Sequence, residues 1–317
     1  MNFKEDTLKL YAAPLSKTED EKCKHAIEAI RDALKNIGYS DNGRSIDVLE
    51  NDTLSYAIRM EKSYSSEKIH IFVQGSYANN TCVRTESDVD VAVVREDIFD
   101  YAFGSPFTQT SPSHREEAVT LKNRTESALE IKFPAQVHRG NKSLKIDGNT
   151  YRKKADAVPS ILVKYYDRSD KGDYSNYVNG INIYADDGSL TTNFPLIHLS
   201  NGRNKNNRTN YYYKRMVRII KKMRYLMSDC GYSSANEVSS FGLESLLWNI
   251  PDEYFMKWHL YGFAFGEIIS YLKDNIWRLD YYYEVNGIKK LCPAQSDVVA
   301  YKNFIDELQR FFVYDPS

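Results

Sequence analysis

Short apolar runs and amphipathic segments alternate along the first part of the 317-residue chain. Residues 17–38 carry apolar side chains at spacings of three and four, which predicts an amphipathic helix. Residues 69–73 form a β-rich apolar run that breaks at Gly75 and Ser76, and residues 91–94 form a second run. The pattern therefore predicts a helix followed by two buried strands with a polar connection between them.

Further elements follow from the same reasoning. Residues 46–63 and 113–131 are expected to be helical. Residues 143–166 predict two strands of a hairpin. Between residues 170 and 210, turn residues, one strand and a polar loop are expected, and we place the boundary between two domains here. The predicted division is residues 1–200, a core with N-terminal helices, and residues 201–317, a helical domain.

The helical half begins with the strongest periodicity in the chain. Residues 211–227 carry an apolar stripe at helical spacing, and later aromatic-rich segments predict packing helices. Nine Lys or Arg side chains lie between Arg203 and Arg224 with no acid among them. Such a run is either a solvated helix face or a surface that binds phosphate, and the pattern leaves both interpretations open.

Composition narrows the function classes. The formal net charge is −1, so no overall positive field attracts nucleic acid. No apolar stretch approaches the length of a membrane span, and the N-terminus lacks the pattern of a secretory signal. The four cysteines are scattered without a C-x-x-C pair, which argues against a zinc site or a disulfide framework. We expect a cytoplasmic protein.

The candidate chemistry lies around the second apolar run. Asp88 and Asp90 are two residues apart at its start, so in a strand they project from the same face. Two such carboxylates repel each other unless a cation lies between them, and divalent cations are the usual solution. Gly75 permits close approach of a phosphate, and Ser76 adds a hydroxyl. Together these residues predict a two-metal phosphoryl-transfer site.

A third acid is expected from the predicted hairpin. Asp156 lies between two alanines in a segment that otherwise looks buried, and a buried acid needs a partner. A metal shared with Asp88 and Asp90 would supply it. An edge-strand acid in solvent is the alternative, and Pro159 fits that alternative too. Asp147 is a rival third acid, although its position beside a Gly-Asn turn explains it equally well.

Gly75-Ser76 followed by Asp88-Val89-Asp90 resembles the signature of the DNA polymerase β-like nucleotidyltransferases, and residues 74–94 are similar to the bacterial cGAS/DncV-like members, the CD-NTases. The resemblance implies an α/β (α+β) core with a mixed sheet, a helical C-terminal half, and an active site in the cleft between them. It also implies that Asp88, Asp90 and Asp156 hold two Mg²⁺ ions, for which Mn²⁺ can substitute.

The resemblance extends into the helical half through residues 193–209, 213–226 and 239–248. It implies that Lys221 and Ser240 bind the triphosphate and that Phe241 stacks on a base. A one-residue shift would give the lysine role to Lys222, and Phe241 could equally be a core residue. In all, the resemblance implies six substrate contacts. They are Gln74, Gly75, Ser76, Lys221, Ser240 and Phe241.

The implied activity is synthesis of a cyclic di- or trinucleotide from NTPs, ATP among them. The product would signal phage infection to a downstream cyclic-nucleotide-activated effector in CBASS defence. We expect a monomer that requires neither nucleic acid nor a membrane. Two alternatives stay open: a template-independent RNA-tailing or oligoadenylate-type transferase with a linear product, and a binding protein with a degenerate transferase core.

Overall fold

The computed structural model describes the chain except residues 52, 84–87, 104–108, 112–113, 167–175 and 317. The chain forms two compact units. The sheet unit comprises Ser16–Asn79 and Ser87–Leu199, and the helical unit comprises Met1–Leu15, Asn80–Glu86 and Ser200–Ser317. The predicted domain of residues 1–200 differs from the sheet unit, because two short segments before residue 200 pack within the helical unit.

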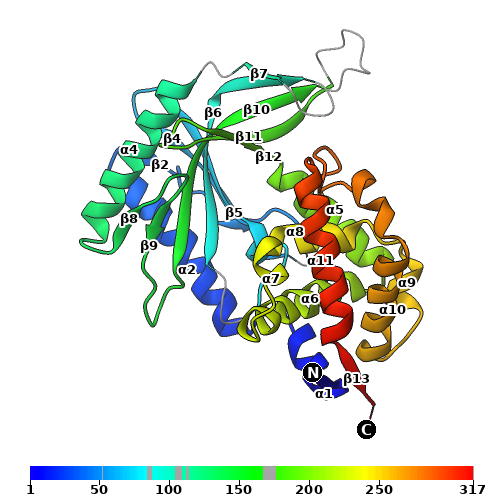
Figure 1. Ribbon diagram of the computed structural model, residues 1–317. Helices are drawn as coiled ribbons and strands as arrows, with labels where there is room; N and C mark the ends of the chain where they lie inside the picture. Colours follow the sequence, from blue (N-terminus) through cyan, green and yellow to red (C-terminus); the bar gives the residue numbers. More distant parts are fainter. Residues whose placement is uncertain (52, 84–87, 104–108, 112–113, 167–175, 317) are drawn as a thin grey trace. The chain divides into compact units, whose positions relative to one another are not determined.

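The sheet unit is built on a mixed sheet whose strands run in the order β12-β11-β10-β6-β5-β4-β2 within the described residues (Figure 1). Strands β6 and β10 are parallel, and their other neighbours are antiparallel. The mixed α/β core expected from the sequence is therefore confirmed. The strands are β2 (Tyr39–Ser40), β3 (Asp47–Val48), β4 (Tyr56–Lys62), β5 (Lys68–Gln74), β6 (Val89–Phe103), β7 (Gln109–Ser111), β8 (Val137–Arg139), β9 (Leu144–Ile146), β10 (Ala155–Tyr166), β11 (Val178–Tyr184) and β12 (Leu190–Asn193).

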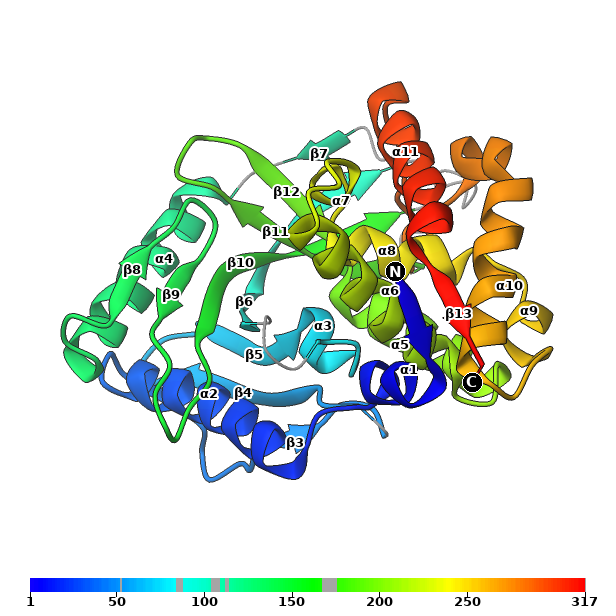
Figure 2. The ribbon, with the colours of Figure 1, turned by 60° about the horizontal axis from the view of Figure 1, so that its bottom comes forward.

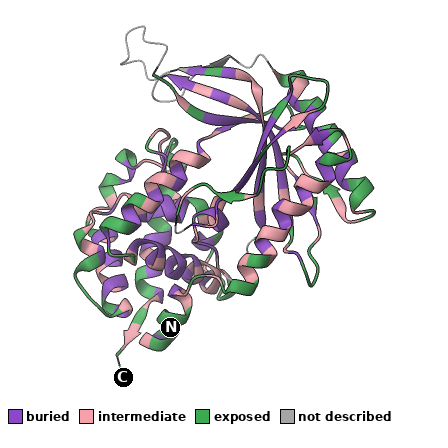
Figure 3. Cartoon of the chain, turned by 180° about the vertical axis from the view of Figure 1, so that it is seen from behind, coloured by how far each residue is buried: buried purple, intermediate pink, exposed green. Residues whose placement is uncertain are grey.

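Two long helices, α2 (Lys17–Lys35) and α4 (Arg115–Lys132), pack against each other and against one face of the sheet (Figure 1). The predicted helices at 17–38 and 113–131 are thus confirmed. Helix α2 begins at a capping box in which Ser16 accepts from the backbone N–H of Glu19. The strands of the sheet carry many buried residues (Figure 3), and alternate positions face these helices. Ile161, for example, lies in one buried cluster with Ala118 of α4.

Two predictions of secondary structure were wrong. Residues 46–63 form β3 and β4 rather than a helix, because pairing with β5 buries Ala57, Ile58 and Met60. The polar segment before residue 210 forms a helix, α5 (Pro195–Arg208), rather than a loop. In α5, the buried Lys205 ammonium donates to the Ile250 carbonyl and to Asp252, so long-range contacts outweigh weak helix propensity.

The helical unit is organised around α6 (Tyr212–Asp229), whose predicted apolar stripe is buried in the core of the unit. A parallel pair of short strands, β1 (Asn2–Lys4) and β13 (Val313–Asp315), joins the beginning and end of the sequence (Figure 2). No described helix combines the length and apolar character required to cross a bilayer. The remaining helices are α1 (Glu5–Ala12), α7 (Ser234–Glu237), α8 (Ser240–Trp248), α9 (Glu253–Met256), α10 (Tyr261–Asp274), the 3₁₀ helix η1 (Ile276–Tyr281) and α11 (Gln295–Phe311).

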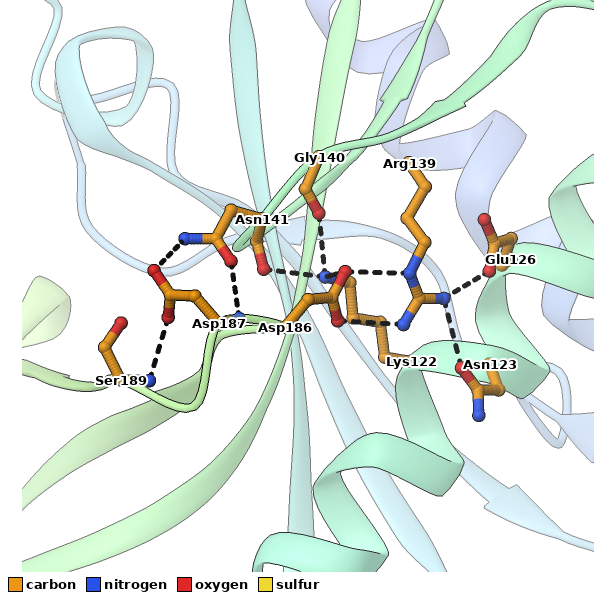
Figure 4. Close-up of polar contacts among 9 residues, drawn as sticks. All are labelled: Lys122, Asn123, Glu126, Arg139, Gly140, Asn141, Asp186, Asp187 and Ser189. Carbon is orange, nitrogen blue, oxygen red and sulfur yellow. Dashed lines mark hydrogen bonds and ion pairs between the residues drawn. The ribbon is translucent and has the colours of Figure 1, made fainter.

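A polar cluster fastens the turn between β8 and β9 to α4 (Figure 4). The ammonium of Lys122, which is 3% exposed, donates to the carbonyls of Gly140 and Asn141 at 2.8 Å each. It also pairs with Asp186 at 2.9 Å, and Arg139 holds Asp186 through two nitrogens. One buried cation therefore joins α4 to the turn at Gly140 and Asn141 and to the side chain of Asp186, and its removal would take a hydrogen-bond donor from both turn carbonyls.

We predict that Lys122→Met lowers the free energy of unfolding by about 2 kcal/mol, because the methionine fills the space but donates no hydrogen bond. The matched control is Lys132→Met on the same helix, an exposed lysine whose ammonium lies 3.7 Å from Asp32. The control should cost less than about 0.5 kcal/mol. Chemical denaturation measures both variants, and equal losses would contradict the role assigned to Lys122.

Candidate active site

The predicted acids of the sheet unit meet on two adjacent strands. In the parallel pair β6–β10, Asp90 lies directly opposite Asp156, and Gln74 on β5 lies opposite Asp90 on its other side. Residues in register on neighbouring strands project from the same face. This face is the one that α2 and α4 leave uncovered, because those helices pack on the side chains of the alternate positions.

The surroundings make negative charge costly at this point. Next to the acids, the same face carries an apolar cluster that includes Phe72, Ala92 and Val158. Burial, followed by the charges of Asp156 and Asp88, raises the pKa of Asp90 to about 7. Without a cation, this carboxyl is therefore partly protonated near neutral pH.

Gly75 brings the end of β5 against the acid. It has a φ of +67°, and a Cβ at this position would lie 2.6 Å from Asp90 Oδ2. Any other residue would therefore collide with the carboxylate as well as strain the backbone. The sequence interpretation gave Gly75 a role in phosphate approach, and the structure shows this further requirement. Ser76 follows in the short helix α3 (Gly75–Ala78) and is half-buried.

Asp88 precedes β6 and has a different environment. Its side chain is 43% exposed, and its Oδ2 lies 3.7 Å from the ammonium of Lys154. Within the part of the chain that the structure describes, no three acidic, His or Cys side chains lie close enough together to hold a metal ion. Closing a three-acid site would therefore require the Asp88 side chain to leave Lys154. Residues 84–87 of the predicted motif lie outside the described residues.

The two carboxylate oxygens of Asp156 differ in their hydrogen bonding. Its Oδ2 accepts a hydrogen bond of 3.1 Å from Ser143 Oγ. Its Oδ1 is buried and has no hydrogen-bond partner among the described residues. One carboxylate oxygen is thus buried without a hydrogen-bond donor, and the neighbouring acid has a raised pKa. Oxygen ligands of this kind are the ones that a divalent cation binds. The acids present therefore fit the metal that the sequence predicted.

Strand pairing bears on both the rival third acid and the edge-strand alternative. Asp147 follows β9 and pairs with His138 at 3.1 Å, both side chains being exposed. Strand β10 is internal, yet on one side β9 pairs with it up to Ala157 and β11 pairs with it from Ile161 (Figure 2). Pro159 lies in the gap between these partners, so its missing N–H breaks no ladder.

In the helical unit, Lys221 is buried and paired. The residue is 2% exposed, and its ammonium lies 2.9 Å from Glu244 Oε2 and donates to the carbonyl and hydroxyl of Thr81. Thr81 Oγ1 also donates to Glu244 at 2.7 Å. Lys222, the alternative lysine, is half-buried. Glu244 and Thr81 were missed because the sequence shows no feature that marks a pair so far apart in the chain.

The basic run is not a solvated face. Lys214 and Arg218 are each 5% exposed. Arg218 donates to the carbonyls of Ala12 and Asn80, which anchors two segments that precede the rest of the helical unit in sequence. Much of the positive charge on α6 thus lies inside the helical unit and not on its surface.

Helix α8 presents the other two predicted contacts. Ser239 caps the helix by accepting from the N–H of Gly242 at 2.9 Å, which confirms the predicted serine cap. Ser240 is half-buried, with its Oγ 3.5 Å from the Tyr225 hydroxyl. Phe241 is 44% exposed, so the alternative that it is a core residue is not what the structure shows.

We predict a pH-dependent effect of Asp90→Asn on stability in metal-free buffer. Folded Asp90 keeps its proton to about pH 7, whereas the unfolded chain loses it near the ordinary value of 3.8. The folded state binds more protons between these values, so the wild-type free energy of unfolding falls as pH rises from about 4 to about 7. Asp90→Asn removes this fall and should gain stability on the order of 4 kcal/mol at pH 8 but nothing near pH 4.

Thermal unfolding with EDTA at both pH values measures this difference. The control is Asp147→Asn, an exposed acid whose loss should change stability by similar small amounts at pH 4 and pH 8. An equal effect of Asp90→Asn at the two pH values would contradict the raised pKa.

Comparison with known proteins agrees with this geometry. The model of the cGAS/DncV-like nucleotidyltransferase C-terminal helical domain matches residues 200–313. The cyclic GMP-AMP synthase CdnE03 of Staphylococcus schleiferi is 42% identical over 318 residues, covering 99% of this chain and 98% of that protein. A cyclic dipurine nucleotide synthase of Elizabethkingia meningoseptica is 34% identical over 267 residues, covering 81% of this chain and 80% of that protein.

Solved structures show the same relationship. The Elizabethkingia meningoseptica CdnE cyclic dinucleotide synthase with GTP and Apcpp has a TM-score of 0.73 at 31% identity, covering 97% of this chain and 99% of that chain. The Rhodothermus marinus CdnE c-UMP-AMP synthase with Apcpp and Upnpp has a TM-score of 0.71 at 25% identity, covering 96% of each chain. The chain is therefore an enzyme, a nucleotidyltransferase, and it belongs to the cGAS/DncV-like family, the CD-NTases.

Proposed function

We propose that this enzyme joins two nucleoside triphosphates into a cyclic dinucleotide that acts as a signal in CBASS anti-phage defence, read by a downstream effector. The observation that carries the proposal is the 42% identity over nearly the whole chain to a cyclic GMP-AMP synthase. That relative's product makes ATP and GTP the expected substrates. The opposed acids Asp90 and Asp156 supply a site suited to phosphoryl transfer.

In the proposed reaction, a sugar hydroxyl of one nucleotide attacks the α-phosphorus of the other triphosphate. A phosphorus–oxygen bond forms, the bond to pyrophosphate breaks, and the hydroxyl proton leaves to a base or to water. A second transfer within the linear intermediate closes the ring and releases the second pyrophosphate. When bound by Asp88, Asp90 and Asp156, two Mg²⁺ ions, or Mn²⁺ in their place, supply positive charge to the triphosphate and acidify the attacking hydroxyl.

The chain's own residues prepare this chemistry. Asp90 holds a proton near neutral pH and must give it up before it can act as a ligand. Asp88 is held by Lys154 at 3.7 Å and must turn away from it to join the other acids. The absence of a Cβ at Gly75 leaves room for the Asp90 carboxylate. Ser76 and Gln74 lie at the same end of β5, where they are proposed to contact substrate.

The proposed contacts on the helical unit are Ser240, Phe241 and Lys221. The exposure of Phe241 supports a role in stacking on a base, because a large exposed aromatic ring offers a flat apolar surface. Lys221 could bind triphosphate only if its pair with Glu244 were exchanged for phosphate. Lys222 on the same helix remains the alternative.

We predict that wild-type protein with the four NTPs and Mg²⁺ forms a phosphatase-resistant product with the mass of cyclic GMP-AMP. Asp88→Asn combined with Asp90→Asn should abolish this product while leaving the fold intact, because the repulsion between the acids is removed. Mass spectrometry identifies the product and circular dichroism checks the fold. The matched control is Asp147→Asn, which removes an exposed acid outside the pair and should leave synthesis unchanged.

Two other results would redirect the proposal. A linear product with a phosphatase-sensitive end would indicate an RNA-tailing or oligoadenylate-type transferase. Full synthesis by the double variant would refute the acids as the catalytic set. The same assay with nuclease-treated protein, with and without added RNA or DNA, tests whether synthesis needs nucleic acid. We expect no change, and a rise of about tenfold, or 1.4 kcal/mol, would contradict that expectation.

We predict that Lys221→Ala destabilises the protein by about 3 kcal/mol, because Glu244 then stays buried without its cation. Its loss of activity alone would therefore not identify a substrate contact. The decisive variant is Lys221→Met combined with Glu244→Leu, which removes both charges together. If Lys221 binds triphosphate, this pair should recover stability but keep a KM for NTP raised about tenfold.

Lys222→Ala is the matched control for that experiment and should leave both stability and KM unchanged. Recovery of a normal KM in the double variant would show that Lys221 acts only inside the fold. A raised KM in Lys222→Ala would move the phosphate contact by one residue.

A further inference from the structure

We propose that Ser143 is a positioning residue that holds the Asp156 carboxylate in the orientation required for its ligand, and that the polar cluster around Lys122 holds Ser143. The inference rests on the proposed function, because it takes Asp156 as one of the catalytic acids. Ser143 lies in the turn of the hairpin β8–β9, which contributes no acid to the site, and Lys122 lies on α4.

The contact itself is specific to one oxygen. Ser143 Oγ donates to Asp156 Oδ2 at 3.1 Å, and Asp156 Oδ1 stays buried without a partner among the described residues. A free carboxyl group on a strand can rotate about its last torsion, which is broad for Asp. A donor on one oxygen restricts that rotation. The second oxygen is then left to whatever ligand lies between Asp156 and Asp90.

Ser143 is placed by strand pairing and a tight turn. It immediately precedes β9, whose residues pair in antiparallel register with the start of β10, Lys145 lying opposite Asp156. The N–H of Gly140 donates to the Ser143 carbonyl at 2.8 Å, which closes the turn between β8 and β9. A Cβ at Gly140 would lie 3.2 Å from that carbonyl and 3.5 Å from Ser143 Oγ, so the turn has little spare room.

Lys122 of α4 and Asp186 hold the turn between β8 and β9 (Figure 4). The buried Lys122 ammonium donates to the carbonyls of Gly140 and Asn141, and the Asp186 N–H donates to the Asn141 carbonyl at 3.0 Å. Asp186 in turn is held by Arg139 through Nε and Nη2, at 2.8 and 2.9 Å. Both ends of the short segment from Arg139 to Ser143 are therefore fixed, one by ion pairs and the other by Asp156.

Ser143 relates to Asp156 as residues around a metal site relate to the ligands, which they hold in place by hydrogen bonds. A ligating carboxylate whose remaining oxygen is hydrogen-bonded is held in place and keeps its basic oxygen directed at the cation. Loss of such a partner typically reduces metal affinity or activity by about 10–100-fold without unfolding the protein. Here Ser143 contacts the Asp156 carboxylate directly, and Lys122 and Asp186 hold the turn that carries Ser143.

The test compares Ser143→Ala with Ser143→Thr and with the control Ser189→Ala. Threonine keeps the hydroxyl. Ser189 lies in the same cluster, where its N–H donates to Asp187 at 2.8 Å, and no hydrogen bond among the described residues joins it to Asp156. Mn²⁺ binding is measured by calorimetry on the protein without nucleotide, and kcat and KM are measured separately on the same preparations.

We expect Ser143→Ala to weaken Mn²⁺ binding about tenfold and to lower kcat by a similar factor, with KM for NTP nearly unchanged. Ser143→Thr and Ser189→Ala should behave as wild type. Normal Mn²⁺ binding and kcat in Ser143→Ala, with Asp156→Asn inactive, would overturn this inference and leave the proposed function standing. Full synthesis by Asp156→Asn would overturn this inference together with the ligand role proposed for Asp156.

Discussion

The repulsion between Asp90 and Asp156 is the constraint on which the rest of the sheet unit depends. Parallel pairing of β6 and β10 puts the two carboxyls opposite each other, and nearby apolar side chains reduce the screening between them. Burial, followed by the charges of Asp156 and Asp88, raises the pKa of Asp90, and this rise reports the cost of ionising an acid at that place. A fold can keep such a pair only if other contacts outweigh the cost, and α2 and α4 provide them by packing on the opposite face of the same strands.

The local parts of this site could be predicted from sequence. Asp88 and Asp90 stand out because side chains in a strand alternate between faces, and Asp156 stands out because a charged residue interrupts a buried run. The choice between Asp156 and Asp147 depended on strand register, which one sequence does not reveal. Pro159 misled for the same reason, since β10 is internal but lacks a partner on one side at that residue.

Long-range contacts explain the remaining differences. Residues 46–63 contain apolar side chains that satisfy a helical spacing, and pairing with β5 selected strands. Helix α5 forms from a segment rich in Asn and Lys because Asp252 and the Ile250 carbonyl hold Lys205. A count of basic residues also gave a misleading view of the surface, because Lys214, Arg218 and Lys221 lie inside the helical unit. Each of these outcomes is decided by residues distant in the sequence.

The raised pKa of Asp90 and the Asp156 oxygen without a hydrogen bond both indicate a site suited to a cation. Ionising the Asp90 carboxyl lowers the free energy of unfolding, because its pKa is higher in the folded than in the unfolded chain. A cation that binds the folded form preferentially would raise that free energy again. The contact between Lys154 and Asp88 reduces the repulsion without a metal, but at 3.7 Å and in partial solvent it does so weakly. Ser143 carries no charge of its own, and its hydrogen bond restricts the rotation of the Asp156 carboxyl. The sheet therefore supplies the proximity of the acids, whereas the hairpin supplies their orientation, and the two can be altered separately.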